Sequence, residues 1–81
     1  MNDQEIKSIL IQLLKKTAPD TEPEELNETA NFRAELGMDS FDFLQFMVAV
    51  NEQLNIEIPE QDYAAVSTLK DLTDYILAKK V

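Results

Sequence analysis

The sequence predicts an all-α fold, a small four-helix bundle with three longer helices, one short third helix and a long first loop. Apolar residues recur every three or four positions in three separate stretches, which is the period of an amphipathic helix. Glycine occurs once and proline three times in 81 residues, so few positions favour a tight turn. A chain of this length supports one hydrophobic core, and we therefore expect a single domain over residues 1–81.

The first helix is predicted to begin near Asn2 and to end before Pro19. Asn2 and Glu5 have the spacing of a capping box, in which each side chain satisfies the backbone N–H of the other residue. Two lysines in the last turn suit the helix dipole. One face is apolar and should enter the core; it consists of Ile6, Ile9, Leu10, Leu13 and Leu14.

Residues 17–39 are predicted to form a long, ordered loop. Prolines and a run of acidic residues favour loop structure, although residues 23–26 could form one helical turn. Leu26, Phe32 and Leu36 are spaced so that each could anchor the loop to the core. Connections of this length are uncommon in compact domains and are often functional.

A second long helix is expected over residues 40–54. Gly37 supplies a turn before it, and Asp39 is a suitable N-cap because its carboxylate can accept a backbone N–H. At about 100° per residue, the broad apolar face consists of Phe43, Phe46, Met47, Val50 and Leu54. A separate apolar strip beside Ser40 consists of Phe41, Leu44 and Val48. A strip of this kind near the surface of a small domain indicates a docking site.

The remaining chain is predicted to contain the short helix and the last helix. Residues 56–59 should be extended, because their apolar residues alternate and Pro59 disfavours helix in the residue before it. Residues 59–65 form the short helix, with proline at its first position. The last helix begins at Ser67 or Thr68 and ends with lysines. Its inner face consists of Leu69, Leu72 and Ile76, with Tyr75 at the edge.

The chain is strongly acidic, with 16 acidic residues, 7 basic residues and a net charge of −9. This balance argues against nucleic acid and anionic membranes, and favours partners with basic surfaces or bound cations. No apolar run reaches the roughly 20 residues that span a bilayer, and the first residues lack a signal pattern, so we expect a cytoplasmic protein. No basic residue occurs between residues 34 and 69, where the acidic residues are Glu35, Asp39, Asp42, Glu52, Glu57, Glu60 and Asp62.

The composition also limits the chemistry that the chain can perform. The absence of cysteine and histidine removes disulfides, the usual zinc ligands, a cysteine nucleophile and an imidazole base. An enzyme of this size would have to rely on carboxylates, so a binding or carrier module is favoured. A calcium-binding protein is disfavoured, because no stretch has the Asp-x-Asp-x-Asp-Gly pattern and we expect no intrinsic metal site.

The pair Asp39-Ser40 has two interpretations. An Asp-Ser pair at a helix start most often serves only as a cap, and a non-carrier helical interaction domain would use it in that way. However, Ser40 follows the only glycine, opens the central helix and lies beside the apolar strip. A hydroxyl at a helix N-terminus is well placed to carry a phosphate, because unpaired N–H groups stabilise the anion. Asp39 would repel that phosphate, which suggests that it holds a cation.

Residues 36–42, Leu-Gly-Met-Asp-Ser-Phe-Asp, resemble the signature of the acyl carrier proteins. Residues 54–59 and 74–76 resemble the same family at matching spacing, so the similarity covers the chain from about residue 30 to its end. The resemblance implies a monomeric four-helix carrier that is not an enzyme. It also implies a 4'-phosphopantetheine arm on Ser40, transferred from coenzyme A by a phosphopantetheinyl transferase with magnesium. Asp39 matches a residue implicated in that transfer, and the thiol of the arm holds acyl groups as thioesters.

The resemblance also assigns residues for partners and cargo. Acyl-transferring, ketosynthase or ligase-type enzymes with basic docking surfaces would bind the residue 40–54 helix. The matching docking residues are Phe41, Asp42, Leu44 and Val48. Acyl chains enter between the helices in this family, and the matching pocket residues are Phe43, Met47, Val50, Ile58, Tyr63 and Val66. For any one of these residues, a simple core position is the favoured interpretation.

Several positions depart from the pattern of the family. Phe41 replaces a leucine, and Phe43 and Tyr63 replace small residues. Amides replace acidic residues that fatty-acid carriers have on this helix, at Gln45, Asn51 and Gln53. These departures favour a specialised fatty-acid, polyketide or lipid pathway over housekeeping fatty-acid synthesis. An aminoacyl or peptidyl carrier remains the alternative.

Overall fold

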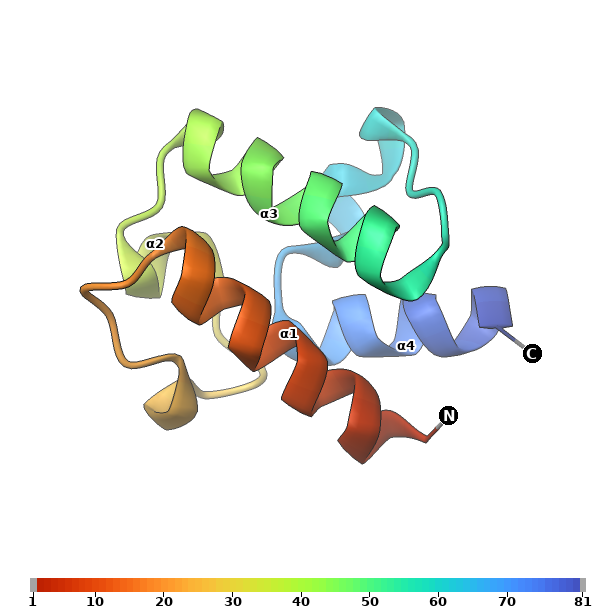
Figure 1. The fold of residues 1–81 in the computed structure, drawn as a ribbon, viewed down its shortest axis with the longest axis horizontal. Coiled ribbons are helices and arrows are strands. Elements are labelled where there is room, and N and C mark those ends of the chain that lie inside the picture. Colours follow the sequence, from red (N-terminus) through yellow and green to blue (C-terminus); the bar gives the residue numbers. More distant parts are fainter. Residues whose placement is uncertain (1, 81) are drawn as a thin grey trace.

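The computed structural model describes residues 2–80, and this part of the chain is helical and contains no strand (Figure 1). The predicted all-α fold is therefore confirmed. In chain order the elements are α1 (Asp3–Thr17), η1 (Pro23–Glu25), α2 (Phe32–Leu36), α3 (Ser40–Leu54), η2 (Glu60–Val66) and α4 (Leu69–Lys80), where η denotes a 3₁₀ helix. The beginning of α1 and the end of α4 lie at one end of the long axis, and α3 begins at the other end, next to α2.

The helix starts follow the predicted capping chemistry. In the capping box of α1, Asn2 Oδ1 accepts a hydrogen bond from Glu5 N at 2.9 Å, and Glu5 Oε1 accepts one from Asn2 N at 3.2 Å. Asp39 caps α3, because its Oδ1 accepts a hydrogen bond from Asp42 N at 2.8 Å. These bonds satisfy N–H groups that have no partner within their own helix.

One hydrophobic core joins the three long helices. Helix α1 contacts both α3 and α4 along its apolar face, and η2 packs against α4. The apolar faces predicted for the three helices lie in this core, apart from the half-buried Ile9 and Tyr75. The buried core residues are Ile6, Leu10, Leu13, Leu14, Phe32, Met38, Phe43, Phe46, Met47, Val50, Leu54, Ile58, Val66, Leu69, Leu72 and Ile76.

Helix α2 was not predicted, because residues 32–36 were assigned to a loop. The side chain of Asn31 caps it by accepting a hydrogen bond from Ala34 N at 3.1 Å. Gly37 ends it in the left-handed conformation, with φ 64°, which glycine adopts without the strain caused by a Cβ. Phe32 is fully buried and holds this short helix against the core. A helix of five residues is too short to show a period, so its formation depends on tertiary contacts.

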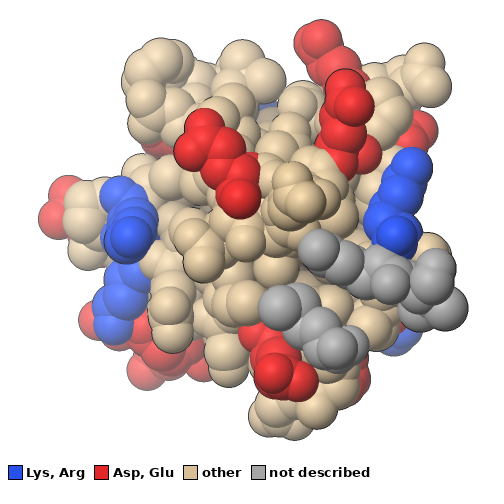
Figure 2. All heavy atoms as spheres, turned by 45° about the vertical axis from the view of Figure 1, so that its right-hand side comes forward, with Lys and Arg blue, Asp and Glu red and all other residues tan. Residues whose placement is uncertain are grey.

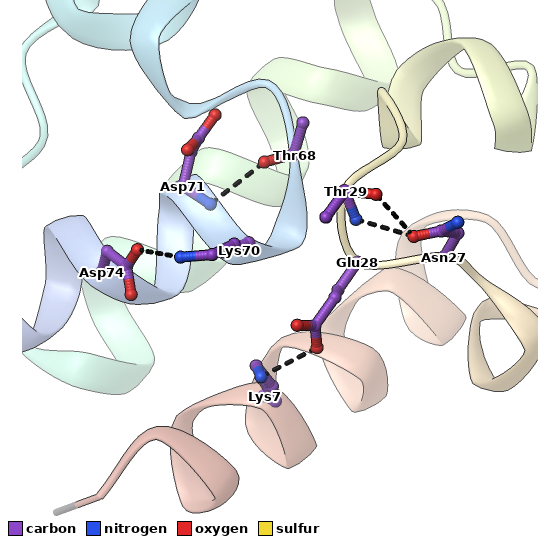
Figure 3. Close-up of polar contacts among 8 residues, drawn as sticks. All are labelled: Lys7, Asn27, Glu28, Thr29, Thr68, Lys70, Asp71 and Asp74. Atoms are coloured by element: carbon purple, nitrogen blue, oxygen red, sulfur yellow. Dashed lines mark hydrogen bonds and ion pairs between the residues drawn. The ribbon is translucent and has the colours of Figure 1, made fainter.

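The connection before α2 is ordered, as predicted, through bonds to α1 and α4, and Figure 3 shows the ion pair that joins it to α1. Lys7 Nζ on α1 lies 2.8 Å from Glu28 Oε2, and Lys70 N on α4 donates to the backbone oxygen of Glu28 at 2.9 Å. Thr29 donates two hydrogen bonds to the side-chain oxygen of Asn27. Further along α1, Lys15 Nζ pairs with Glu24 Oε1 at 2.6 Å. The loop is therefore attached to two helices at once.

The short third helix is present as the 3₁₀ helix η2, one residue later than predicted. A hydrogen bond joins it to α4, because Tyr75 Oη donates to Asp62 Oδ2 at 2.7 Å. This bond, with burial and the negative charge of Asp62 as smaller contributions, raises the pKa of the Tyr75 hydroxyl above its usual value. Helix α4 begins just after Thr68, which caps it, since Thr68 Oγ1 accepts from Asp71 N at 3.0 Å. Among residues 2–80, no helix has the length and apolarity needed to cross a membrane.

Candidate functional site

Ser40 is the first residue of α3, and its side chain is exposed. The position of this serine is set by the residues just before it. Met38 is buried, and its N–H donates to the backbone oxygen of Arg33 at 2.9 Å, so the turn at Gly37 is closed against α2. Because Asp39 serves as the N-cap, the Ser40 hydroxyl is not needed for capping. An exposed hydroxyl is thus held on a rigid helix start.

Arg33 is the residue of this site that sequence reasoning missed. Its Nη2 donates to Ser40 Oγ at 3.5 Å, and its guanidinium carbon lies 4.6 Å from the centre of the Phe43 ring. In the sequence, Arg33 is the one basic residue that lies outside the stretches predicted as the first and last helices. It comes next to Ser40 because α2 and the left-handed turn at Gly37 reverse the chain. A basic residue seven positions before the serine was the available signal, but its meaning depended on the unpredicted helix.

A groove runs from Ser40 between α3 and η2. Its floor includes two aromatic rings, since Phe43 and Tyr63 meet edge to face with centroids 5.4 Å apart. The residues that line it are Arg33, Ser40, Phe43, Leu44, Glu60 and Tyr63. A second depression shares Arg33, Phe43 and Tyr63 and extends to Asn31, Ala64 and Ser67. The guanidinium of Arg33 therefore lies at the junction of two hollows beside the serine.

The predicted docking strip lies at the surface of α3. The exposed fraction is 65% for Phe41, 45% for Leu44 and 52% for Val48, whereas Asp42 is half-buried. The three apolar side chains form one wall of a shallow groove toward the end of α1. This groove is lined by Thr17, Phe41, Leu44, Gln45, Val48, Ala49 and Glu52. The strip and Ser40 thus share one helix, and Leu44 lines both the groove beside the strip and the hollow beside Arg33.

The predicted acyl-pocket residues lie on the inner side of the same helix and beyond it. Tyr63 is half-buried, and the other five are buried: Phe43, Met47, Val50, Ile58 and Val66. Phe43 belongs to an aromatic cluster, because its centroid is 6.0 Å from that of Phe32, which in turn lies 5.5 Å from Phe46. Burial of this kind is expected both for a core and for the walls of a cargo pocket.

The charges around the site are mostly negative. Helices α3 and η2 contain no basic residue, and Asp39, Asp42 and Glu60 lie at the start of α3 or along the groove. Figure 2 shows one face of the molecule, on which acidic side chains are widely spread and basic side chains lie toward the edges. Within residues 2–80, no three potential metal ligands come together.

Comparison with known proteins agrees with this geometry. Residues 4–76 match the family described as "Phosphopantetheine attachment site". Two proteins named "Acyl carrier protein" are similar at 33% identity. The one from Wolinella succinogenes aligns over 94% of this chain and 93% of its own length, and the one from Zymomonas mobilis over 90% and 87%. A protein from Neurospora crassa named "Acyl carrier protein, mitochondrial" is 30% identical over 98% of this chain, which spans only 59% of that relative.

Proposed function

The chain belongs to the acyl carrier proteins, a family with a phosphopantetheine attachment site, and from this premise we propose that Ser40 is the residue that carries the arm. Members of the family hold a covalently attached 4'-phosphopantetheine and are carriers, not enzymes. When attached, this group supplies a thiol that holds an acyl chain as a thioester. The task of the protein itself is to present the attachment residue, to position the arm and to offer a surface to partner enzymes.

The exposed hydroxyl at the capped start of α3 is the observation that carries the proposal. Asp39 Oδ1 already accepts the N–H of Asp42, so Ser40 Oγ can be esterified without removing the cap. The other two serines lack this setting, since Ser8 lies within α1 and Ser67 is half-buried before α4. The residues near Ser40 also fit a phosphate, because a guanidinium lies next to its hydroxyl.

In the proposed modification, Ser40 Oγ forms a bond to the phosphorus of coenzyme A that bears the pantetheine. The bond from that phosphorus to the bridging oxygen of the diphosphate breaks, adenosine 3',5'-bisphosphate leaves, and the hydroxyl proton passes to a base of the transferase. Asp39 would help to hold the magnesium ion, which would offset the negative charge of the reacting phosphate groups. Its fixed orientation as an N-cap supports this role, because a positioned ligand needs little reordering.

The docking surface for the transferase and for acyl-transferring, ketosynthase or ligase-type enzymes is proposed to be the outer face of α3. Large apolar side chains exposed on one helix of a small protein are typical of an interaction site, and here they are Phe41, Leu44 and Val48. Asp42 adds a negative charge beside them, which would suit a basic partner. The amide of Gln45 at the edge of the groove, where Glu52 is the acidic residue of the lining, makes the groove less acidic than a row of carboxylates would be.

The pathway is proposed to be a specialised fatty-acid, polyketide or lipid route, with an aminoacyl or peptidyl carrier as the second candidate. The aromatic cluster supports this choice, because the rings of Phe43 and Tyr63 meet between α3 and η2 and the ring of Phe32 on α2 packs against Phe43. Met47, Val50, Ile58 and Val66 would complete a cargo pocket beneath these rings. Since interiors are close-packed, a long chain would have to displace the rings to enter. We therefore propose short or polar cargo.

Mass spectrometry tests the attachment site. The wild-type protein incubated with coenzyme A, magnesium and a broad-specificity phosphopantetheinyl transferase is expected to gain one phosphopantetheine mass. The Ser40→Ala variant should stay folded and gain none, and the matched control Ser8→Ala should be modified like the wild type. Modification of Ser40→Ala at the wild-type rate, or no modification of any form, would contradict the proposal.

A further inference from the structure

We propose that Arg33 binds the phosphodiester on Ser40 and holds the first part of the arm in the groove between α3 and η2, outside the bundle. The inference rests on the proposed attachment at Ser40 and adds to it an anion-binding residue and a path for the arm. Arg33 lies outside the segment that carries the family signature, and its place beside the serine is visible only in the folded chain.

The first support is geometry. Arg33 Nη2 is 3.5 Å from Ser40 Oγ, the atom that would bear the phosphorus. The non-bridging oxygens of the phosphodiester would lie beyond this atom, on the solvent side. A guanidinium has five N–H donors in a planar fork, and it can therefore donate to two phosphate oxygens at once. A small rotation of the Arg33 side chain would exchange its long contact with the hydroxyl for two charge-assisted hydrogen bonds.

The second support is that Arg33 is held in place but has no anionic partner in the part of the chain that the structure describes. Its guanidinium lies over the Phe43 ring at 4.6 Å, a cation–π geometry, and that ring is buried against Phe32 and Tyr63. Three lysines form ion pairs with carboxylates, whereas no carboxylate within residues 2–80 lies within 4.0 Å of the Arg33 guanidinium. An orientated cation that keeps its donors for an anion is suited to bind one.

The third support is the charge of the surroundings. A phosphodiester on Ser40 adds a negative charge beside Asp39 and Asp42, and no basic residue occurs in α3 or η2 to offset it. Repulsion between like charges on neighbouring residues is appreciable even near a protein surface. Arg33 is the basic residue that the fold brings to this position, so it supplies the opposite charge that the attached group needs.

The hollows beside Arg33 fit the chemistry of the next part of the arm. The pantoyl unit has two methyl groups, which suit the rings of Phe43 and Tyr63. The amides that follow could bond to Asn31 and Ser67 in the adjoining depression. An arm on this path would contact Leu44 but leave Phe41 and Val48, the other two residues of the strip, free for a partner enzyme. Release of the arm would then require the exchange of its contacts with Arg33 and the groove for contacts with the partner.

Nuclear magnetic resonance on the modified protein tests the inference. Four forms are compared after confirmation of folding and of the phosphopantetheine mass: wild type, Arg33→Gln, Arg33→Lys and Lys16→Gln. The last is the matched control, since it removes one exposed positive charge from α1. In wild type and the control we expect a shift of the ³¹P resonance with added salt, and nuclear Overhauser effects between the pantoyl methyls and the rings of Phe43 and Tyr63.

The Arg33→Gln variant should lose most of these effects, with cross-peaks about fivefold to tenfold weaker, and Arg33→Lys should be intermediate because it keeps the charge but not the fork. In wild type the Arg33 Nε–H resonance should move when the phosphopantetheine arm is attached to the unmodified protein. An unmoved resonance, or cross-peaks in Arg33→Gln equal to those of wild type, would overturn the inference and leave the attachment at Ser40 intact. If no form gains the phosphopantetheine mass, both this inference and the proposed attachment at Ser40 would be overturned.

Discussion

On the side of the bundle formed by α1, α4 and the loop before α2, lysines lie next to carboxylates, whereas α3 and η2 carry acidic residues and no basic residue. We call these the paired side and the acidic side. On the paired side, Lys7 and Lys15 join the loop to α1. On the acidic side, the large exposed apolar residues are found, and Arg33 reaches it from α2.

The difference indicates how one small domain separates stability from recognition. Exposed ion pairs contribute little free energy each, so the pairs on the paired side mainly fix where the loop lies. Uncompensated charge on the acidic side destabilises the isolated protein slightly but attracts basic partners at long range. The apolar residues Phe41, Leu44 and Val48 would then supply the short-range contact.

Removal of buried aromatic surface should give the largest effect. The Phe32→Ala variant loses a fully buried ring that contacts Phe43 and Phe46, and we expect its free energy of unfolding to fall by about 3–5 kcal/mol. The matched change Phe41→Ala on the acidic side removes a ring that is 65% exposed and should cost less than about 0.5 kcal/mol. Urea titration of both variants measures the difference, and equal losses would contradict the separation.

The same Phe41→Ala variant should weaken the reaction with partners. Loss of an exposed aromatic side chain at the centre of an interface raises a dissociation constant by roughly tenfold. We therefore expect the transferase to modify Phe41→Ala with a kcat/KM several times lower than that of wild type. A matched apolar change on the paired side, Ile11→Ala, should leave this rate unchanged, since Ile11 lies on α1. Equal rates for Phe41→Ala and wild type would remove Phe41 from the docking surface.

Loss of the bond between η2 and α4 should have a smaller effect that depends on pH. The hydrogen bond to Asp62 raises the pKa of Tyr75 above its ordinary value of 10.0. The stabilisation is therefore complete below pH 10.0 and is lost as the pH rises through the folded-state pKa. The Tyr75→Phe variant should melt at a lower temperature than wild type at pH 7, and the difference should shrink above pH 10.0. A constant difference up to pH 11.5 would show that the hydroxyl does not titrate in this way.

The smallest effects are expected from the ion pairs and from salt. The Lys7→Gln variant should melt within a few degrees of wild type, but limited proteolysis within residues 18–31 should be faster because the loop loses its bond to α1.

Added sodium chloride should raise the melting temperature of wild type, since relief of repulsion within a chain of net charge −9 outweighs the weakening of three exposed pairs. A fall in the melting temperature would mean that the weakening of the ion pairs on the paired side outweighs the relief of repulsion on the acidic side.

The sequence predicted the long helices well because their signals are local. The bounds of α3 agree with the prediction, since Asp39 has capping chemistry and the apolar residues repeat over four turns. The burial of Phe32 was also foreseen from its spacing. Helix α2 was not, because its five residues form a helix only when Phe32 is packed into the core.

In the candidate site, too, the features that local patterns encode could be predicted and those that depend on tertiary contacts could not. Ser40 and the strip on α3 could be identified from periodicity and from the signature, which act within one segment. The position of Arg33 depends on the left-handed turn at Gly37 and on the depth at which Phe32 is buried. A pattern within one segment cannot contain that information, because the contact between Arg33 and Ser40 joins two elements.

The placement of the ends of α1 and α4 has a practical consequence. Both lie at one end of the long axis, while α3 begins at the other, near α2 (Figure 1). A fusion partner, an affinity tag or a bead attached at either terminus would thus be remote from Ser40 and from the groove beside it. The protein should be suited to immobilisation with the proposed attachment residue facing solution, and several copies could be arrayed on one support without obstruction of Ser40.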